Sequence, residues 1–234
     1  MSFPFRIETG PEHSAPLPAA ADLVVIGGGV IGVTAALFAC RAGLDVVLIE
    51  KGRVAAEQSS RNWGWVRVQG RDLAEIAIAQ EAQALWRTLD AETGGALGLR
   101  QTGVTYIART AREHARFAAW RDAALPFGVS TQMLDRADLI DLVGAVRADW
   151  IGGMHTPTDM VAEPWVAVPE LARSAAAEGV RVREGCAARG LRLVGGRVTG
   201  VVTEAGTIAA PQVILAGGAW SSLFLRRHNV SIPQ

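Results

Sequence analysis

The segment GGGVIG places Gly27, Gly29 and Gly32 in the spacing G-x-G-x-x-G. The first glycine allows a tight turn, the second lets a pyrophosphate approach the backbone, and the third lets a helix pack close to a strand. The N–H groups at the start of that helix can then donate to the phosphates. Glu50 follows at close to the distance expected for an acid that binds a ribose hydroxyl. We therefore predict a dinucleotide site here, rather than a glycine-rich turn without a ligand.

The type of dinucleotide depends on residues outside this pattern. Glu50 disfavours NADP, even with Arg53 nearby, because a carboxylate repels a 2′-phosphate. NAD and FAD share the glycine pattern, so both stay open at this point. Residues 58–70, QSSRNWGWVRVQG, favour a flavin, whose large ring needs backbone amides and close-packed surfaces along one side. We expect the indoles of Trp63 and Trp65 to seal this pocket against water; ordinary core packing is the alternative for both residues.

The elements around the glycines follow a β-α-β pattern. Leu23–Ile26 is a short apolar strand, residues 33–43 have helical periodicity and end at Gly43, and residues 45–50 form a second strand. The rest of the chain predicts helices over 72–89, 111–125 and 165–178, a strand over 103–110, and short strands over 180–215 with a hairpin turn at Gly195 and Gly196.

Composition limits the classes of partner. The chain has 234 residues, half of them apolar, which is enough for a core or for two small domains. Its 23 basic and 23 acidic residues balance, which argues against nucleic acid or an anionic membrane surface as the main partner. Cys40 and Cys186 lie far apart and form no CxxC pair, so we expect neither a disulfide framework nor a metal site, and a reducing cytoplasm.

Two stretches need separate interpretations. Residues 1–20 lack an apolar signal region and are expected to form a flexible, proline-bearing arm. Leu23–Cys40 contains 18 residues without a charge, at the lower edge of the length of a membrane span. Its glycines favour a buried strand, a turn and a buried helix instead.

The sequence resembles the D-amino-acid-oxidase-like flavoproteins, which include glycine oxidase, sarcosine oxidase and the bacterial D-amino-acid dehydrogenases. The resemblance runs from about Asp22 to the end and rests on VVIGGGVIGVTAALFACRAGLDVVLIEK, SSRNWGW and VILAGGAWS. It implies FAD as the cofactor and transfer of a hydride to flavin from the carbon beside an amine. The catalytic residues stay unknown. His155 lies where the family's substrate sheet approaches the flavin, and a structural histidine is the alternative interpretation.

The resemblance also implies a set of FAD-binding residues, one group for each part of the cofactor. The pyrophosphate group is Gly27, Gly29, Val30, Ile31 and Gly32, and the ribose group is Glu50 and Lys51. The segment beside the phosphate chain and flavin ring contributes Ser59, Asn62, Trp63 and Gly64. Ala188, which replaces the family's usual valine, would contact the adenine through its backbone. The last turn that returns to the cofactor is Ala216, Gly217 and Gly218.

The fold that the resemblance implies is α/β, a doubly wound, Rossmann-like FAD-binding domain with an inserted, partly β substrate domain, truncated at the C-terminus. We expect an arm over 1–20, the first part of the FAD-binding domain over 21–98, the first part of the substrate domain over 99–160, and the second part of the FAD-binding domain over 161–234.

Family members continue beyond the length of this chain, so we expect the N-terminal portion of a longer enzyme that oxidises the C–N bond of an amino acid or secondary amine. Its partners would be that small-molecule substrate and an electron acceptor, with a peripheral membrane partner as a further option. The alternatives are a non-catalytic flavin-binding remnant, one subunit of a split enzyme whose second subunit supplies the C-terminal half, or an NAD-dependent dehydrogenase.

Overall fold

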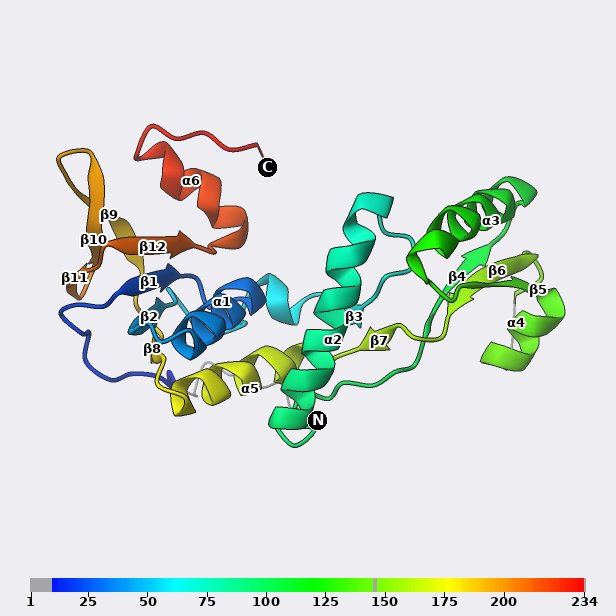
Figure 1. The fold of residues 1–234 in the computed structure, drawn as a ribbon, viewed down its shortest axis with the longest axis horizontal. Coiled ribbons are helices and arrows are strands. Elements are labelled where there is room, and N and C mark those ends of the chain that lie inside the picture. Colours follow the sequence, from blue (N-terminus) through cyan, green and yellow to red (C-terminus); the bar gives the residue numbers. More distant parts are fainter. Residues whose placement is uncertain (1–9, 145–146, 234) are drawn as a thin grey trace. The chain divides into compact units, whose positions relative to one another are not determined.

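The structure is a computed structural model that describes residues 10–144 and 147–233. The described residues form two compact units, and the chain leaves the first unit and returns to it (Figure 1). The first unit comprises the residues up to Asn62 and those from Pro164 onward, and the second comprises Trp63–Glu163.

The first unit is built on a four-stranded parallel sheet in the order β12-β1-β2-β8. The central strands β1 (Leu23–Ile26) and β2 (Val46–Ile49) consist of leucine, valine and isoleucine, and all of these residues are buried. β12 (Gln212–Leu215) pairs with β1 and β8 (Arg181–Arg183) pairs with β2. Continuous apolar strands of this kind are typical of a parallel sheet that is covered on both faces.

One face of this sheet is covered by a second sheet. The antiparallel strands are β9 (Ala188–Val194), β10 (Arg197–Thr203) and β11 (Gly206–Ala209). Buried side chains of β10 and β11, with half-buried ones of β9, pack in a core shared with Val24 and Val47. The strands expected over 180–215 are therefore confirmed. The hairpin turn between β9 and β10 is also confirmed, since both of its glycines have the positive φ that such turns require.

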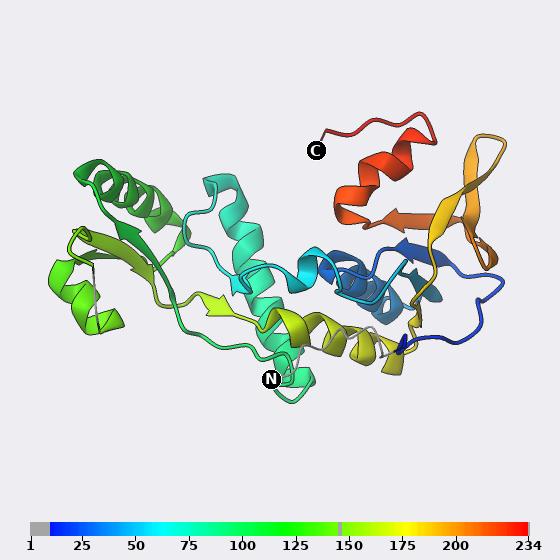
Figure 2. The same ribbon diagram turned by 180° about the vertical axis from the view of Figure 1, so that it is seen from behind.

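Helices α1 (Val30–Arg41) and α5 (Pro164–Ala177) cover the other face. The two helices contact each other and lie side by side in both ribbon views (Figures 1 and 2). Since strand side chains alternate between faces, Val25 and Leu48 point toward these helices. The α/β, Rossmann-like fold is confirmed, with helices on one face and an antiparallel sheet on the other.

The second unit holds a separate antiparallel sheet. Its order is β4-β6-β5, and a two-stranded ladder pairs β3 with β7. The expectation that the strand over 103–110 lies outside the parallel sheet is confirmed. The strands are β3 (Trp65–Val66), β4 (Val104–Ala108), β5 (Gln132–Asp135), β6 (Gly152–Thr156) and β7 (Met160–Val161). The helices are α2 (Ile76–Glu92), α3 (Ala111–Ala124) and α4 (Arg136–Val143).

The border between the units differs from the one that the sequence predicted. Residues 63–98 were expected in the first unit, but they group with the second. β3 pairs with β7, and the N–H of Ala162 donates to the carbonyl of Gly64 at 2.9 Å. Bonds between segments so far apart in the sequence tie the start of this unit to its end.

The N-terminal arm also differs from the expectation. Its described part, residues 10–20, packs against the first unit, whereas a flexible arm was predicted; its first nine residues lie outside the described part. The Glu184 carboxylate accepts the N–H groups of Glu12 and His13 at 2.6 and 3.1 Å. Leu17 packs against the core between the two sheets of the first unit. A buried carboxylate that accepts backbone N–H groups is a strong anchor for such a segment.

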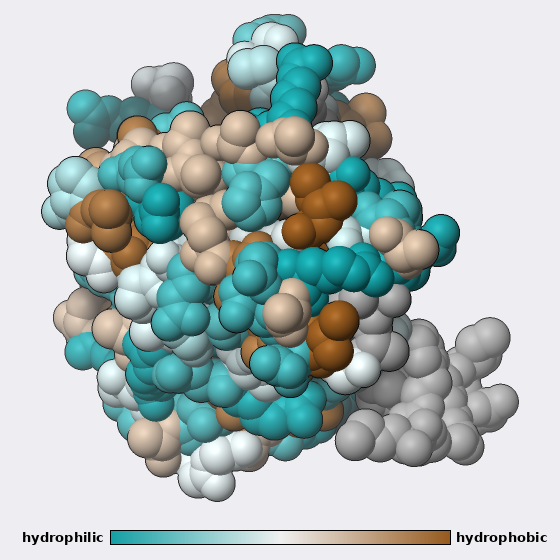
Figure 3. Space-filling view, turned by 90° about the vertical axis from the view of Figure 1, so that its right-hand side faces the viewer, coloured by the Kyte–Doolittle hydropathy of each residue, from teal (hydrophilic) through white to brown (hydrophobic). Residues whose placement is uncertain are grey.

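The remaining features of the fold concern where its apolar side chains lie. In the part of the chain that the structure describes, no helix has both the length and the apolarity needed to cross a bilayer. The uncharged stretch Leu23–Cys40 forms β1, the glycine turn and most of α1. On the face that Figure 3 presents, apolar side chains form small separate groups between hydrophilic ones.

Candidate cofactor-binding site

Two of the three spaced glycines are required by the backbone itself. Gly27 has φ +115°, and a Cβ there would lie 2.4 Å from the carbonyl oxygen of Ala216. A Cβ on Gly32 would lie 1.8 Å from the carbonyl oxygen of Gly27. Strand β1, helix α1 and the turn after β12 therefore pack too closely for a side chain at either position.

Gly29 is different. Its φ of −77° and ψ of 177° suit any L-residue. Apart from its chain neighbours, a Cβ there would meet one atom of the described residues within 4 Å, the Ser59 hydroxyl oxygen, at 3.1 Å. The fold thus gives little reason for a glycine at this position, whereas a ligand that approaches the backbone does.

The N-terminus of α1 faces open space beside Gly29. No acidic residue occupies its first turn, and Gly29 has no side chain to cap it. The N–H of Val30 donates to the Ser59 hydroxyl at 2.9 Å, so the partner there is a neutral group. A helix N-terminus that carries partial positive charge and has no acidic residue in its first turn suits an anionic ligand such as a pyrophosphate.

Glu50 directly follows β2 and is buried, with 8% of its surface exposed. Its two carboxylate oxygens accept the N–H groups of Gly28 and Gly52, at 2.7 and 2.8 Å. The acid therefore fixes the glycine turn as well as facing the site. Since each carboxylate oxygen has two lone pairs, Glu50 keeps capacity to accept a hydroxyl.

Lys51 is held at the edge of the same site. Its ammonium lies 2.7 Å from the Glu57 carboxylate, and this hydrogen bond lowers the pKa of Glu57. The ammonium also lies 4.8 Å from the centre of the Trp220 ring. A cation at this distance from an indole face is attracted to it, so Trp220 helps to position Lys51.

These groups border two adjoining cavities of the first unit, of about 590 and about 310 Å³. Gly27, Glu50 and Lys51 line both. The larger cavity brings together most of the predicted residues, namely Gly27, Gly29, Val30, Ile31, Glu50, Lys51, Ser59, Asn62, Ala216, Gly217 and Gly218. Ala188, predicted at the adenine, lines the smaller one.

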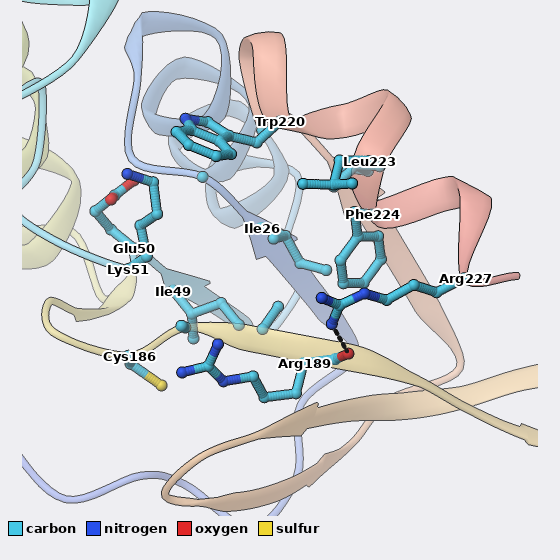
Figure 4. Close-up of a pocket in the computed structure, with 15 residues that line it drawn as sticks. Ile26, Ile49, Glu50, Lys51, Cys186, Arg189, Trp220, Leu223, Phe224 and Arg227 are labelled. Atoms are coloured by element: carbon cyan, nitrogen blue, oxygen red, sulfur yellow. Dashed lines mark hydrogen bonds between the residues drawn. The ribbon is translucent and has the colours of Figure 1, made fainter. Parts of the chain in front are cut away.

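The smaller cavity has largely apolar walls. Figure 4 shows Ile26 beside Phe224, while Ile49 lies further away, toward Cys186. Cys186 borders the cavity as well, and burial raises the pKa of its thiol, so the group is neutral. A flat apolar ring system such as adenine fits a wall of this composition.

Sequence reasoning missed several residues of these cavities. Trp220 belongs to the quoted VILAGGAWS segment, so its position there was a signal that could have been used. Most of the other residues lie within three positions of a predicted one, which was a usable signal, whereas Leu223, Phe224 and Arg227 follow the last glycine turn by five residues or more. The other residues include Ile26, Ile49, Arg53, Gln58, Cys186, Arg189, Leu223, Phe224 and Arg227.

Three predicted residues do not line the cavities. Gly32 lies behind them, where its role is the close packing described above. Trp63 and Gly64 belong to the second unit. Gly64 is buried and has φ +72°, which is reason enough for a glycine. Trp63 is 81% exposed and stacks on Trp65, which is 45% exposed, so neither residue is packed in a core, and the seal around a flavin stays a prediction.

His155, in β6 of the second unit, is held by its neighbours. Its Nδ1 lies 2.9 Å from the Thr105 hydroxyl oxygen, and burial lowers its pKa. A Cβ on Gly103 would lie 2.2 Å from the ring, so Gly103 makes room for it. These contacts favour the structural interpretation. Among residues 10–144 and 147–233, no cluster of histidine, cysteine and carboxylate side chains could hold a metal ion.

Comparison with known proteins supports a cofactor site. Residues 22–234 match the model of a family described as FAD dependent oxidoreductase. Human mitochondrial sarcosine dehydrogenase is 29% identical over 228 residues, which cover 94% of this chain and 25% of that enzyme. The mitochondrial regulatory subunit of mouse pyruvate dehydrogenase phosphatase is 27% identical, over 91% of this chain and 24% of that protein.

A solved structure agrees with the fold. The L-amino acid deaminase from Proteus vulgaris superimposes with a TM-score of 0.88 and 32% identity, over 94% of this chain and 52% of that chain. This chain thus spans about half the length of the deaminase and about a quarter of that of the human dehydrogenase.

Proposed function

Because the chain belongs to the family of FAD-dependent oxidoreductases, we propose that it binds FAD in the two cavities of the first unit and serves the oxidation of an amino acid or secondary amine. The observation that carries this proposal is Gly29. It borders the uncapped N-terminus of α1 and the larger cavity, where the fold itself has little need of a glycine.

The residues present fit the cofactor part by part. The first-turn N–H groups of α1 would bind the pyrophosphate, with Gly29 allowing its approach. Glu50 would accept a ribose hydroxyl through its remaining lone pairs. The smaller, apolar cavity beside Ala188 would take the adenine. Ser59 and Asn62 line the larger cavity, toward which the rest of the cofactor would extend.

A bound flavin supplies a group that accepts a hydride from the carbon beside the amine. The contribution of this chain to such a step is to hold and orient the cofactor, since orientation alone accounts for a large part of many enzymatic rate enhancements. Glu50 is buried and fixed by two backbone N–H groups, and Lys51 is held by Glu57 and Trp220. The site is therefore ordered before a ligand arrives, which lowers the entropic cost of binding.

The test is cofactor content followed by reduction. The chain should purify with FAD, or take it up at a ratio of about one per chain, and NAD in excess should not displace it. A panel of sarcosine, glycine, proline and D- and L-amino acids is then added without oxygen, and loss of the flavin absorbance is followed. Absence of FAD binding by folded protein would refute the cofactor assignment.

A non-catalytic flavin-binding role is the second candidate. The observation that favours it is the similarity to a regulatory subunit, which covers 91% of this chain. The two candidates differ in the reduction test, because a non-catalytic protein would bind FAD that dithionite reduces but no amine does. The electron acceptor, a second subunit and a cytoplasmic location stay predictions, and fractionation of the source cells with co-purification would test the last two.

A further inference from the structure

Arg67 has unusual surroundings in the second unit. It directly follows strand β3, and its guanidinium carbon lies 5.6 Å from the ring centre of Trp65 and 5.8 Å from that of Tyr106. Two aromatic rings therefore lie within the range of a cation–π interaction with one cation. Because guanidinium stacks by its faces, its in-plane N–H groups stay available for hydrogen bonds.

The charge of Arg67 has no matching carboxylate. Its side chain donates one hydrogen bond, to the carbonyl oxygen of Gln69, and it forms no ion pair with any described residue. Arg71, four residues later, is paired with Glu75. A guanidinium has five N–H donors, so one neutral hydrogen bond leaves most of them for another acceptor.

The rings beside Arg67 contact further aromatic rings. Tyr106 lies over Gly70, where a Cβ would meet its ring carbon at 2.8 Å, and it contacts Phe117 with 6.0 Å between ring centres. Trp65 contacts Tyr106 at 6.2 Å and Trp63 at 5.7 Å between ring centres. The four rings form a continuous row with Arg67 alongside it.

The row ends in an apolar surface open to solvent. Trp63 is 81% exposed and Trp65 is 45% exposed, so both present indole surface next to an unmatched cation. Large aromatic side chains favour burial, and an exposed aromatic surface of this kind commonly marks a binding site. A ligand that satisfies both features carries an anionic group for Arg67 and a flat apolar group for the indoles.

We propose that Arg67, Trp65 and Tyr106 form a site for the carboxylate of a small molecule that carries an aromatic or other flat apolar group, with Trp63 extending the apolar surface. Planar, bidentate recognition of a carboxylate is the use to which a guanidinium is best suited. This inference rests on the proposed function, because an amino acid with an aromatic side chain carries both of these groups.

The test uses 3-phenylpropanoate as the probe, with its neutral amide and propanoate as comparisons, and titration calorimetry on the purified chain. We expect 3-phenylpropanoate to bind about 10- to 100-fold more tightly than the amide, as a charge-assisted hydrogen bond to guanidinium predicts. Arg67→Gln should abolish this preference. Trp65→Leu should reduce the advantage of 3-phenylpropanoate over propanoate.

Arg116→Gln is the matched control, because Arg116 also lies over an aromatic ring, that of Phe117, at 5.6 Å, but outside the proposed site. It should keep the preference for the acid. Equal binding of acid and amide by the unaltered chain would overturn the proposal whatever the variants do, and so would an Arg67→Gln variant that keeps the preference.

The two proposals fail separately. Each titration is run with and without FAD, and FAD content is measured by absorbance. Binding of FAD without an Arg67-dependent preference for the acid would leave the cofactor assignment and remove this one. The reverse result would leave a carboxylate site in a protein that is not a flavoprotein.

Discussion

Replacing Gly29 with alanine should separate cofactor binding from folding. The backbone angles at Gly29 suit alanine, and the added methyl group meets only the Ser59 hydroxyl oxygen at 3.1 Å, which can move by a few tenths of an ångström. We therefore expect the free energy of unfolding without FAD to stay within about 1 kcal/mol of the original value. The methyl group would stand where the pyrophosphate approaches, so FAD should bind less tightly.

The size of the effect follows from linkage between binding and stability. A 100-fold loss of affinity corresponds to about 2.7 kcal/mol. At an FAD concentration 100 times the dissociation constant, the original chain gains about 2.7 kcal/mol of stability, and the variant would gain about 0.4 kcal/mol. At roughly 2–4 °C per kcal/mol for a chain of this size, FAD should raise Tm by about 5–11 °C in the original and about 1–2 °C in the variant.

Gly32→Ala is the contrasting variant. Its methyl group would lie 1.8 Å from the backbone oxygen of Gly27, which has little room to move. Overpacking of this kind costs about 1–3 kcal/mol, and the better helix propensity of alanine offsets about 1 kcal/mol at most. We expect Tm to fall without FAD. Thermal unfolding with and without FAD measures both variants, and a full FAD-induced shift in Gly29→Ala would refute the role given to Gly29.

Three further outcomes follow from the contacts. Ser59→Ala removes the acceptor of the Val30 N–H, 2.9 Å away, and should lower the free energy of unfolding by about 1 kcal/mol, as measured by urea denaturation. An unchanged urea midpoint would show that this hydrogen bond does not stabilise the fold. Asp159 is fully buried and accepts two backbone N–H groups and a glutamine amide. Asp159→Asn should therefore lower the free energy of unfolding by about 3 kcal/mol in the same assay. The control Asp141→Asn, at an exposed position of α4, should change that free energy by less than about 0.5 kcal/mol. Burial lowers the pKa of His155 below 6.5, so its imidazole binds a proton more readily in the unfolded chain than in the folded one. The stability contributed by the neutral imidazole is therefore present above about pH 6.5 and is lost as the pH falls toward the folded pKa. The difference in stability between the original chain and His155→Gln should therefore decrease on acidification from pH 7 to 5, and a constant difference would contradict this.

The sequence predicted the parts of the site that depend on neighbouring residues. The strand, glycine turn and helix around Gly27, Gly29 and Gly32 follow from local spacing, and so does the position of Glu50 at the end of the next strand. The hairpin at Gly195 was predictable for the same reason, because only positive φ angles join two such strands by two residues. Local rules sufficed wherever the partners lie within one supersecondary unit.

The remaining features depend on partners far away in the chain. Glu184 anchors the N-terminal arm by accepting two of its backbone N–H groups, and nothing near either segment signals that bond. The border at Asn62 follows from the pairing of β3 with β7, which are both only two residues long. Strand signals need longer runs than that. The double use of Glu50 was missed because the glycine pattern assigns the acid to the ligand alone.

The order of strands in the parallel sheet has a consequence for synthesis of the chain. Leu23 pairs with Gln212, so one side of the central strand β1 has no partner until the ribosome has made β12, almost 190 residues later. At about 5–20 residues per second, that delay is roughly ten to forty seconds. The contiguous second unit, Trp63–Glu163, is complete well before then. During this interval the apolar strands LVVI and VVLI have unsatisfied backbone edges, which makes the nascent first unit prone to pair with other chains.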